Sequence, residues 1–271
     1  MKVRVIAAAV LLPLLLIMLL LLPAAVTTVV CGLAAAIAVY ELLMGTGLVK
    51  NVRMVIYTGL MAFLVPLWNH FEMVSSAADL AILLFTALLF MELLISKGKL
   101  PVGQLGVCYI GGIVLPMLLS SLVRLQGLGY GRFYVLLPFL LSFTADTGAY
   151  FAGRFLGKHK LAPVISPNKT VEGVVGGVAG AIVGMLLYCV VLDLAFDFTA
   201  NYMYAVSYGI VGSLAAVFGD LSFSAIKRQT GIKDYGNLIP GHGGILDRFD
   251  SMMTVAPLIE VLLLILPFAV S

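Results

Sequence analysis

Long apolar runs, separated by short polar segments, make up most of this chain. Most runs have about 20 residues, the length that a helix needs to cross about 30 Å of hydrocarbon. The runs do not alternate apolar and polar residues, which argues against a transmembrane β-barrel. We therefore predict an all-α polytopic integral membrane protein with about nine transmembrane helices, over residues 3–22, 24–44, 53–71, 79–96, 103–123, 133–152, 171–192, 202–223 and 252–270.

The first two predicted helices are the least clearly separated. Only Pro23 lies between them, so they form either a tight helical hairpin or one long, kinked helix. Lys2 and Arg4, followed by a leucine-rich run, also resemble a signal peptide. We expect a retained helix instead, because the apolar run is longer than a usual signal core.

Composition supports the assignment to a membrane. Of the residues, 62% are hydrophobic and 11% are charged, whereas soluble domains have about 25% charged residues. Mean hydropathy is +1.14. A net charge of +3 is too small to indicate nucleic acid as a partner. The cysteines Cys31, Cys108 and Cys189 stand singly in apolar runs, without the paired spacing of zinc or redox sites.

Basic residues predict the orientation. If the N-terminus is cytoplasmic, every lysine and arginine except Arg124 and Arg132 falls in a cytoplasmic segment. Such a bias is what the positive-inside rule describes. We therefore expect a cytoplasmic N-terminus, with the polar segments 153–170 and 224–251 also on the cytoplasmic side of the membrane.

Acidic residues also occur within or beside the apolar runs. Asp146 lies inside one of them, and a carboxylate within a membrane helix is costly unless it is paired or faces water. Asp146 is therefore a functional candidate, and the alternative is a structural ion pair with Arg154. Other polar residues lie near helix ends, where we expect them to reach the interface or pair with one another: Glu41, His70, Glu72, Asp79 and Glu92.

The polar segment 219–250 concentrates several kinds of chemistry. Carboxylates suit a hard cation, basic side chains suit phosphate, and glycines let a ligand approach the backbone. We predict metal-assisted phosphate chemistry here, and the alternative is a charged, flexible loop. The segment contains Asp220, Asp234, Asp247, Asp250, Lys227, Arg228, Lys233 and Arg248, with glycines at 231, 236, 241, 243 and 244.

A second polar segment, 157–170, precedes a glycine-rich helix. Ser166 and Pro167 are typical of a helix start, where free N–H groups favour a phosphate and Lys169 would add a positive charge. Alternatively, its lysines only fix the orientation. Gly176, Gly180 and Gly184 then follow at a spacing that permits close helix packing, either within one chain or in a homodimer.

Together these motifs resemble the signature of the phosphatidate cytidylyltransferase (CDP-diacylglycerol synthase) family. The resemblance lies in SAIKRQTGIKDYGNLIPGHGGILDRFD at 224–250, DTGAY at 146–150 and SPNKTVEG at 166–173. It covers roughly the C-terminal half. We therefore divide the chain into N-terminal transmembrane helices over residues 1–130 and a catalytic transmembrane region with cytoplasmic motif loops over residues 131–271.

The resemblance implies transfer of the cytidylyl group of CTP to phosphatidic acid, giving CDP-diacylglycerol and pyrophosphate for phospholipid biosynthesis. The bilayer is then a partner as well. A homodimer would suit the family and the glycine-lined helix. The alternatives are a CTP-dependent polyprenol kinase, which would release CDP, and a transporter with coupling sites at Asp146 and Asp220.

We assign the site residues on this basis. Mg²⁺ is expected on Asp220 and Asp247, with Asp250 as a further ligand, and Asp146 and Asp234 could support a second cation. Asp220, Lys227, Asp247 and Arg248 form the predicted catalytic set. His242 would contact either a phosphate or the backbone of its turn. The predicted substrate-binding set is Asp146, Ser166, Asn168, Lys169, Ser224, Arg228, Lys233, Asp234, His242, Gly243 and Gly244.

Overall fold

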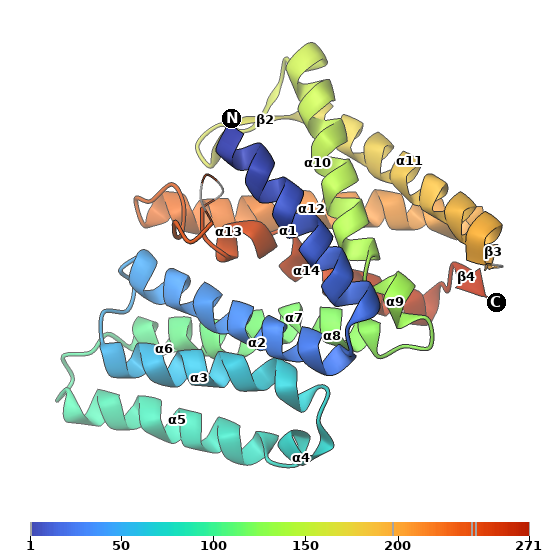
Figure 1. Ribbon diagram of the computed structural model, residues 1–271. Coiled ribbons are helices and arrows are strands. Elements are labelled where there is room, and N and C mark those ends of the chain that lie inside the picture. Colours follow the sequence, from blue (N-terminus) through green and yellow to red (C-terminus); the bar gives the residue numbers. More distant parts are fainter. Residues whose placement is uncertain (1, 197, 240, 242, 271) are drawn as a thin grey trace. The chain divides into compact units, whose positions relative to one another are not determined.

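Figure 1 shows the chain as a computed structural model that describes residues 2–196, 198–239, 241 and 243–270. Its contacts divide the chain into two compact units. Unit 1 consists of Met1–Tyr134 and Lys227–Phe249, and unit 2 of Val135–Ile226 and Asp250–Ser271. The polar segment 219–250 is therefore shared between the units, and its residues 227–249 belong with the N-terminal helices.

Unit 1 is helical. Its central helices α2 and α3 pack through small side chains, because Ala35, Ala38, Ala62 and Val65 are exposed by 2% or less. Its elements are α1 (Lys2–Leu21), α2 (Ala24–Tyr40), the π-helical turn η1 (Glu41–Gly45), α3 (Val52–Trp68), α4 (Glu72–Ser75), α5 (Ala78–Ile95), α6 (Val102–Tyr109), the π-helical turn η2 (Ile110–Val114), α7 (Leu115–Leu119), α8 (Ser121–Gln126), α9 (Gly131–Tyr134) and α13 (Leu246–Phe249).

The structure separates the first two predicted helices. Helix α1 ends at Leu21 and α2 begins at Ala24, after Pro23, whose ψ of 146° lies outside the helical range. Proline cannot donate the hydrogen bond that would continue the first helix. The alternative of one long, kinked helix is therefore wrong.

Unit 2 contains four long or intermediate helices and two small antiparallel sheets, β1 with β2 and β3 with β4. Helix α12 belongs to this unit up to Ile226, and its last residues belong to unit 1. The elements are α10 (Leu137–Leu156), β1 (Lys160–Ala162), β2 (Ser166–Thr170), α11 (Val171–Phe196), β3 (Thr199–Ala200), α12 (Tyr202–Gln229), α14 (Met252–Ile265) and β4 (Ala269–Val270).

Six helical segments of the described chain are long and apolar enough to cross a membrane: Ala24–Gly45, Ala78–Ile95, Val102–Gln126, Gly131–Leu156, Val171–Phe196 and Tyr202–Gln229. The three other segments predicted from the sequence are also helical, at Lys2–Leu21, Val52–Trp68 and Met252–Ile265. The latter two have 17 and 14 residues. An all-helical chain with six such segments is therefore established, and the count of nine stays a prediction.

Helices α10 and α11 approach each other backbone to backbone. A methyl group at Gly180 would lie 2.6 Å from the carbonyl oxygen of Thr144, and one at Gly148 would lie 2.3 Å from that of Gly176. Side chains at these positions would force the helices apart, since no rotamer change could make room. The predicted close packing of the glycine-rich helix is therefore made within this chain.

We expect Gly180→Ala to lower the midpoint of thermal unfolding in detergent, because overpacking typically costs about 1–3 kcal/mol. Gly59→Ala is the control, since a methyl group at Gly59 would have no neighbour within 4 Å. A Gly180→Ala protein as stable as the Gly59→Ala protein would contradict the close α10–α11 contact.

Candidate active site

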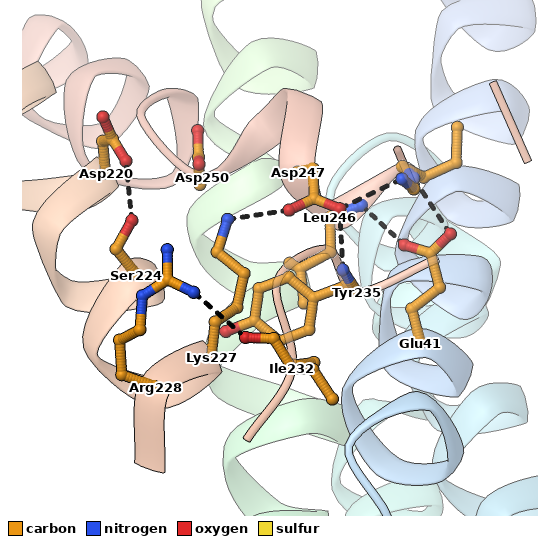
Figure 2. A network of polar contacts seen from close by, with 12 residues as sticks. Glu41, Asp220, Ser224, Lys227, Arg228, Ile232, Tyr235, Leu246, Asp247 and Asp250 are labelled. Carbon is orange, nitrogen blue, oxygen red and sulfur yellow. Dashed lines mark hydrogen bonds and ion pairs between the residues drawn. The ribbon is translucent and has the colours of Figure 1, made fainter. Parts of the chain in front are cut away.

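Asp247 is the centre of a buried polar cluster in unit 1 (Figure 2). The residue is 6% exposed and lies in α13. Lys227 Nζ donates to its Oδ1 at 2.8 Å, and the backbone N–H groups of Tyr235 and Gly244 donate to its Oδ2 at 2.8 and 3.0 Å. Three donors, one of them charged, fix both oxygens of this carboxylate.

Lys227 is buried with its partner. Its side chain is 10% exposed, and its Nζ also lies 5.4 Å from the centre of the Tyr235 ring. A buried ammonium group needs such compensation, because burial of an unpaired charge is very costly. The predicted catalytic residues Lys227 and Asp247 are thus neighbours, although they are 20 residues apart in the chain.

The loop around this cluster is irregular. Gly241 and Gly243 have φ angles of +77° and +84°, in the left-handed region that favours glycine. The N–H of Ile239 donates to the carbonyl oxygen of Gly243 at 2.9 Å, which closes the tight turn. His242 and Pro240, inside this turn, lie outside the described residues, so the assignment of His242 stays a prediction.

Glu41 joins the same loop and was missed as a site residue. It is 5% exposed, and its carboxylate accepts the backbone N–H groups of Ile245 and Leu246 at 3.0 and 2.8 Å. Glu92 is 4% exposed and pairs with Arg53 at 2.9 Å. The expectation that these two glutamates reach the interface or pair within the set of Glu41, His70, Glu72, Asp79 and Glu92 is therefore wrong. Glu41 lies inside the predicted helix 24–44, so the rule that selected Asp146 would also have selected it.

Asp220 lies in a separate cluster within unit 2. Lys169 Nζ lies 2.5 Å from its Oδ2, and the Ser224 hydroxyl donates to its Oδ1 at 3.0 Å. The side chains of Asp220 and Lys169 are 29% and 25% exposed, so the ion pair stays open to solvent. The spacing of Asp220 and Ser224 by four residues in α12 places both on one face of the helix, as predicted.

The chain around Asp250 packs against the same part of α12. A methyl group at Gly219 would lie 2.7 Å from the carbonyl oxygen of Asp250. The Thr254 hydroxyl donates to the carbonyl oxygen of Ala215 at 2.8 Å. Two predicted metal ligands, Asp220 and Asp250, therefore come from adjoining segments of unit 2, as Figure 2 also shows.

A pocket of about 200 Å³ opens beside the Lys169–Asp220 pair. It is lined by Asp146 and Tyr150 of α10 and by Asn168 and Lys169 of β2, with apolar residues of α11 and α12. Asp146 is exposed and faces this pocket. The pocket thus combines a carboxylate, an ammonium group and an amide with an apolar lining, which suits an amphiphilic ligand.

The predicted helix start at Ser166 and Pro167 is wrong. Residues Ser166–Thr170 form strand β2, which pairs with β1. Helix α11 begins at Val171, and the hydroxyl of Thr170 accepts the N–H of Gly173 at 3.0 Å. The helix is capped by Thr170 and not by Ser166, because residues 166–170 pair with β1 in the hairpin.

Four further predicted residues, Arg228, Lys233, Asp234 and Arg248, are exposed in unit 1. Arg228 donates to the carbonyl oxygen of Ile232 at 3.3 Å. Charged side chains at the surface are accessible to a soluble polyanion. Their assignment to phosphates stays a prediction.

Within the described part of the chain, no three or more His, Cys, Asp or Glu side chains gather closely enough to hold a metal ion. This donor set still fits Mg²⁺, which usually keeps several waters and uses one or two carboxylates together with substrate phosphates. Both Asp220 and Asp247 offer hard oxygen donors in polar surroundings.

Comparisons with known proteins agree with these motifs. A sequence model described as the cytidylyltransferase family matches residues 2–266. A phosphatidate cytidylyltransferase of Staphylococcus aureus (strain COL) is 45% identical over 139 residues, 49% of this chain and 50% of that protein. The proteins of the same name from Staphylococcus haemolyticus (strain JCSC1435) and Staphylococcus epidermidis (strain ATCC 12228 / FDA PCI 1200) are 46% identical over 134 residues, at the same coverage. The chain spans about half the length of the curated relatives it matches.

Proposed function

Because this chain belongs to the cytidylyltransferase family, we propose that it is a phosphatidate cytidylyltransferase. It transfers the cytidylyl group of CTP to phosphatidic acid and releases CDP-diacylglycerol and pyrophosphate. The observation that carries the proposal is the family match over residues 2–266, joined by 45% identity to bacterial enzymes of that name. The pocket beside Lys169 and Asp220 supports it, since a phospholipid needs both polar and apolar surroundings.

The reaction needs neutralisation of charge more than a protein nucleophile. A phosphate oxygen of phosphatidic acid attacks the α-phosphorus of CTP, the new P–O bond forms, and pyrophosphate leaves with its bonding electrons. Attack of one anion on another requires cations and fixed donors to hold both in line. We assign this role to Lys169 beside the pocket and to Lys227 and the exposed Arg228, Lys233 and Arg248.

Asp220 and Asp247 would hold Mg²⁺, with Asp250 as a further ligand and Asp146 or Asp234 as candidates for a second cation. Magnesium, when bound, would offset the negative charge of the CTP phosphates. Ser224 would orient Asp220 through the hydrogen bond already present, and Lys227 would do the same for Asp247. Asp146, Ser166, Asn168, Gly243, Gly244 and His242 are proposed to line the substrate path.

We further propose the full membrane arrangement: nine transmembrane helices in the bacterial inner membrane, with the N-terminus and the site on the cytoplasmic side. The distribution of lysine and arginine supports this orientation. The site would then open sideways to the inner leaflet for the lipid and downward to the cytosol for CTP. A homodimer is compatible with the remaining exposed apolar helix faces. The oligomeric state of the protein can be measured in detergent.

Product analysis tests the function. Purified protein is incubated with Mg²⁺, with CTP labelled at the α- or γ-phosphate, and with either phosphatidic acid or a polyprenol. We expect α-label in a lipid and γ-label in pyrophosphate. The release of CDP with γ-label on a lipid would indicate a CTP-dependent lipid kinase instead. No lipid-dependent consumption of CTP would contradict both enzymes and favour a transporter.

Removal of divalent cations is expected to stop the reaction completely. The predicted ligands are hard carboxylate oxygens, which bind Mg²⁺ only weakly without substrate phosphates, so a chelator should strip the site. Turnover is measured in excess chelator and after Mg²⁺ is restored. Full activity in chelator would exclude the proposed metal chemistry, while a matched excess of calcium-loaded chelator controls for effects of the chelator itself.

Accessible cysteines are expected to react only from the cytoplasmic face. His159 in unit 2 and Asn237 in unit 1 are both exposed, and the natural Cys31, Cys108 and Cys189 are all buried and can be replaced. His159→Cys or Asn237→Cys is introduced into this background and treated with a membrane-impermeant thiol reagent. Labelling of inside-out vesicles alone is expected, whereas labelling of intact cells would invert the proposed topology.

A further inference from the structure

A glutamate from the N-terminal half of the chain holds the loop that carries Asp247. Glu41 lies in the π-helical turn η1, directly after α2. Its Oε1 accepts the N–H of Ile245 at 3.0 Å and its Oε2 accepts the N–H of Leu246 at 2.8 Å. Figure 2 shows the Glu41 carboxylate pointing at the backbone of Leu246, the residue directly before Asp247.

The same run of backbone is held from the other side by Asp247 itself. The N–H of Gly244 donates to Asp247 Oδ2 at 3.0 Å. Three successive N–H groups, of Gly244, Ile245 and Leu246, therefore all point to carboxylate oxygens, one to Asp247 and two to Glu41. Both ends of the short segment are fixed, so the direction of the Asp247 side chain depends on Glu41.

Two glycines of the loop lie directly against the Glu41 carboxylate. A methyl group at Gly236 would lie 2.5 Å from Glu41 Oε1, and one at Gly244 would lie 2.4 Å from both carboxylate oxygens. Neither glycine has a positive φ, unlike Gly241 and Gly243. A side chain at 236 or 244 would therefore have to displace the Glu41 carboxylate, a reason for glycine that involves no ligand.

The charge of Glu41 is suited to this contact. A carboxylate offers acceptors on both oxygens, whereas the amide of glutamine would turn a donor toward one of the two N–H groups. At 5% exposure, water cannot replace the lost acceptor freely. The contact therefore selects for glutamate over its neutral isostere.

We propose that Glu41 is a positioning residue: through the amides of Ile245 and Leu246 it holds Asp247 in the orientation that cytidylyl transfer requires. The inference rests on the proposed function, in which Asp247 belongs to the catalytic set. It assigns a task in the reaction to the N-terminal region, outside the motifs that carry the family signature.

The test compares Glu41→Gln with Glu92→Gln. Glu92 is the matched control, because it is equally buried in unit 1 but binds Arg53 and Asn51. In Glu41→Gln we expect amide hydrogen exchange over residues 236–247 to become about 10-fold faster, as one protected amide is freed. We also expect kcat to fall by about 10- to 100-fold, as misplacement of a reacting group does, with little change in the KM for CTP. Glu92→Gln is expected to leave exchange in 236–247 and kcat unchanged.

Unchanged exchange over 236–247 in Glu41→Gln would overturn the contact, and faster exchange with an unchanged kcat would overturn the positioning role. An equal loss of kcat in Glu92→Gln would show that kcat falls through loss of stability and not through misplacement of Asp247, and would also overturn the positioning role. If the unaltered protein makes no CDP-diacylglycerol, the proposed function fails, yet the exchange measurement still decides whether Glu41 holds the loop.

A second variant covers the case in which Glu41→Gln does not fold. In Gly236→Ala, the added methyl group would displace the Glu41 carboxylate from the loop side, while Glu41 itself is unchanged. We expect it to give the same pair of changes, faster exchange over 236–247 and a lower kcat, while Gly59→Ala gives neither. Normal exchange and normal kcat in Gly236→Ala would overturn the proposal.

Discussion

Replacement of Asp247 by asparagine is expected to abolish cytidylyl transfer and to destabilise the protein at the same time. The change removes one charge from a buried pair and leaves the ammonium group of Lys227 without its partner. Loss of one partner of a buried ion pair costs about 3–5 kcal/mol. The loss of a metal ligand would in addition lower the rate by roughly 1,000-fold or more, since metal ions stabilise transition-state charge by several kcal/mol.

The two effects can be separated with a second substitution. In the double variant Asp247→Asn with Lys227→Met, no unpaired charge remains, so the midpoint of thermal unfolding should recover in part while turnover stays absent. Both properties are measured in detergent on purified protein. Recovery of turnover in the double variant, or ample turnover in Asp247→Asn alone, would remove Asp247 from the catalytic set.

Asp220→Asn is expected to stop turnover almost as fully but to leave stability unchanged. Its ion pair with Lys169 is partly exposed, with side chains 29% and 25% accessible, and such pairs contribute only about 0–1 kcal/mol to folding. The expected loss of rate is roughly 100- to 1,000-fold, from a missing metal-ligand charge. Rates and unfolding midpoints are compared with those of the unaltered protein.

Asp193→Asn is the control for Asp220→Asn within unit 2. Asp193 accepts the N–H of Ala200 at 2.9 Å and the hydroxyl of Tyr202 at 2.6 Å, so its contacts are structural. We expect this variant to lose some stability and to keep its turnover number. A destabilised Asp220→Asn protein with normal turnover would contradict the assignment of Asp220 as a metal ligand. A stable Asp193→Asn protein that has lost its turnover would contradict the use of Asp193 as a structural control.

The helices could be predicted from the sequence because burial in lipid leaves a strong signal. Every apolar run of membrane length formed a helix, since a chain in hydrocarbon must satisfy its own backbone hydrogen bonds. Pro23 marks the boundary of two predicted segments, and in the structure the first helix ends before it, at Leu21, and the second begins after it, at Ala24. The close packing at Gly180 followed from residue size alone.

Two features are not predicted from the sequence, for different reasons. The β1–β2 hairpin is a local pairing, but its Ser166-Pro167 pair is also compatible with a helix start, and strand propensity depends strongly on context. The contact of Glu41 could not be predicted because its partners are backbone amides about 200 residues later in the chain. Sequence periodicity contains no information about such a contact. The presence of a carboxylate in an apolar segment, however, indicates that the carboxylate needs a partner, because burying it without one is costly.

The contact between α10 and α11 has a further consequence for the hairpin that joins these helices. Glycine has no side-chain rotamers to lose, so the packing of Gly148 against Gly176 and Gly180 costs no side-chain entropy. The two helix ends, at Leu156 and Val171, are therefore held at a fixed separation, and Lys169 lies on the strand that leads directly into the second of them. If Lys169 binds a substrate phosphate as proposed, its ammonium group would do so from a preorganised backbone, and less of the binding energy would be spent on ordering the loop.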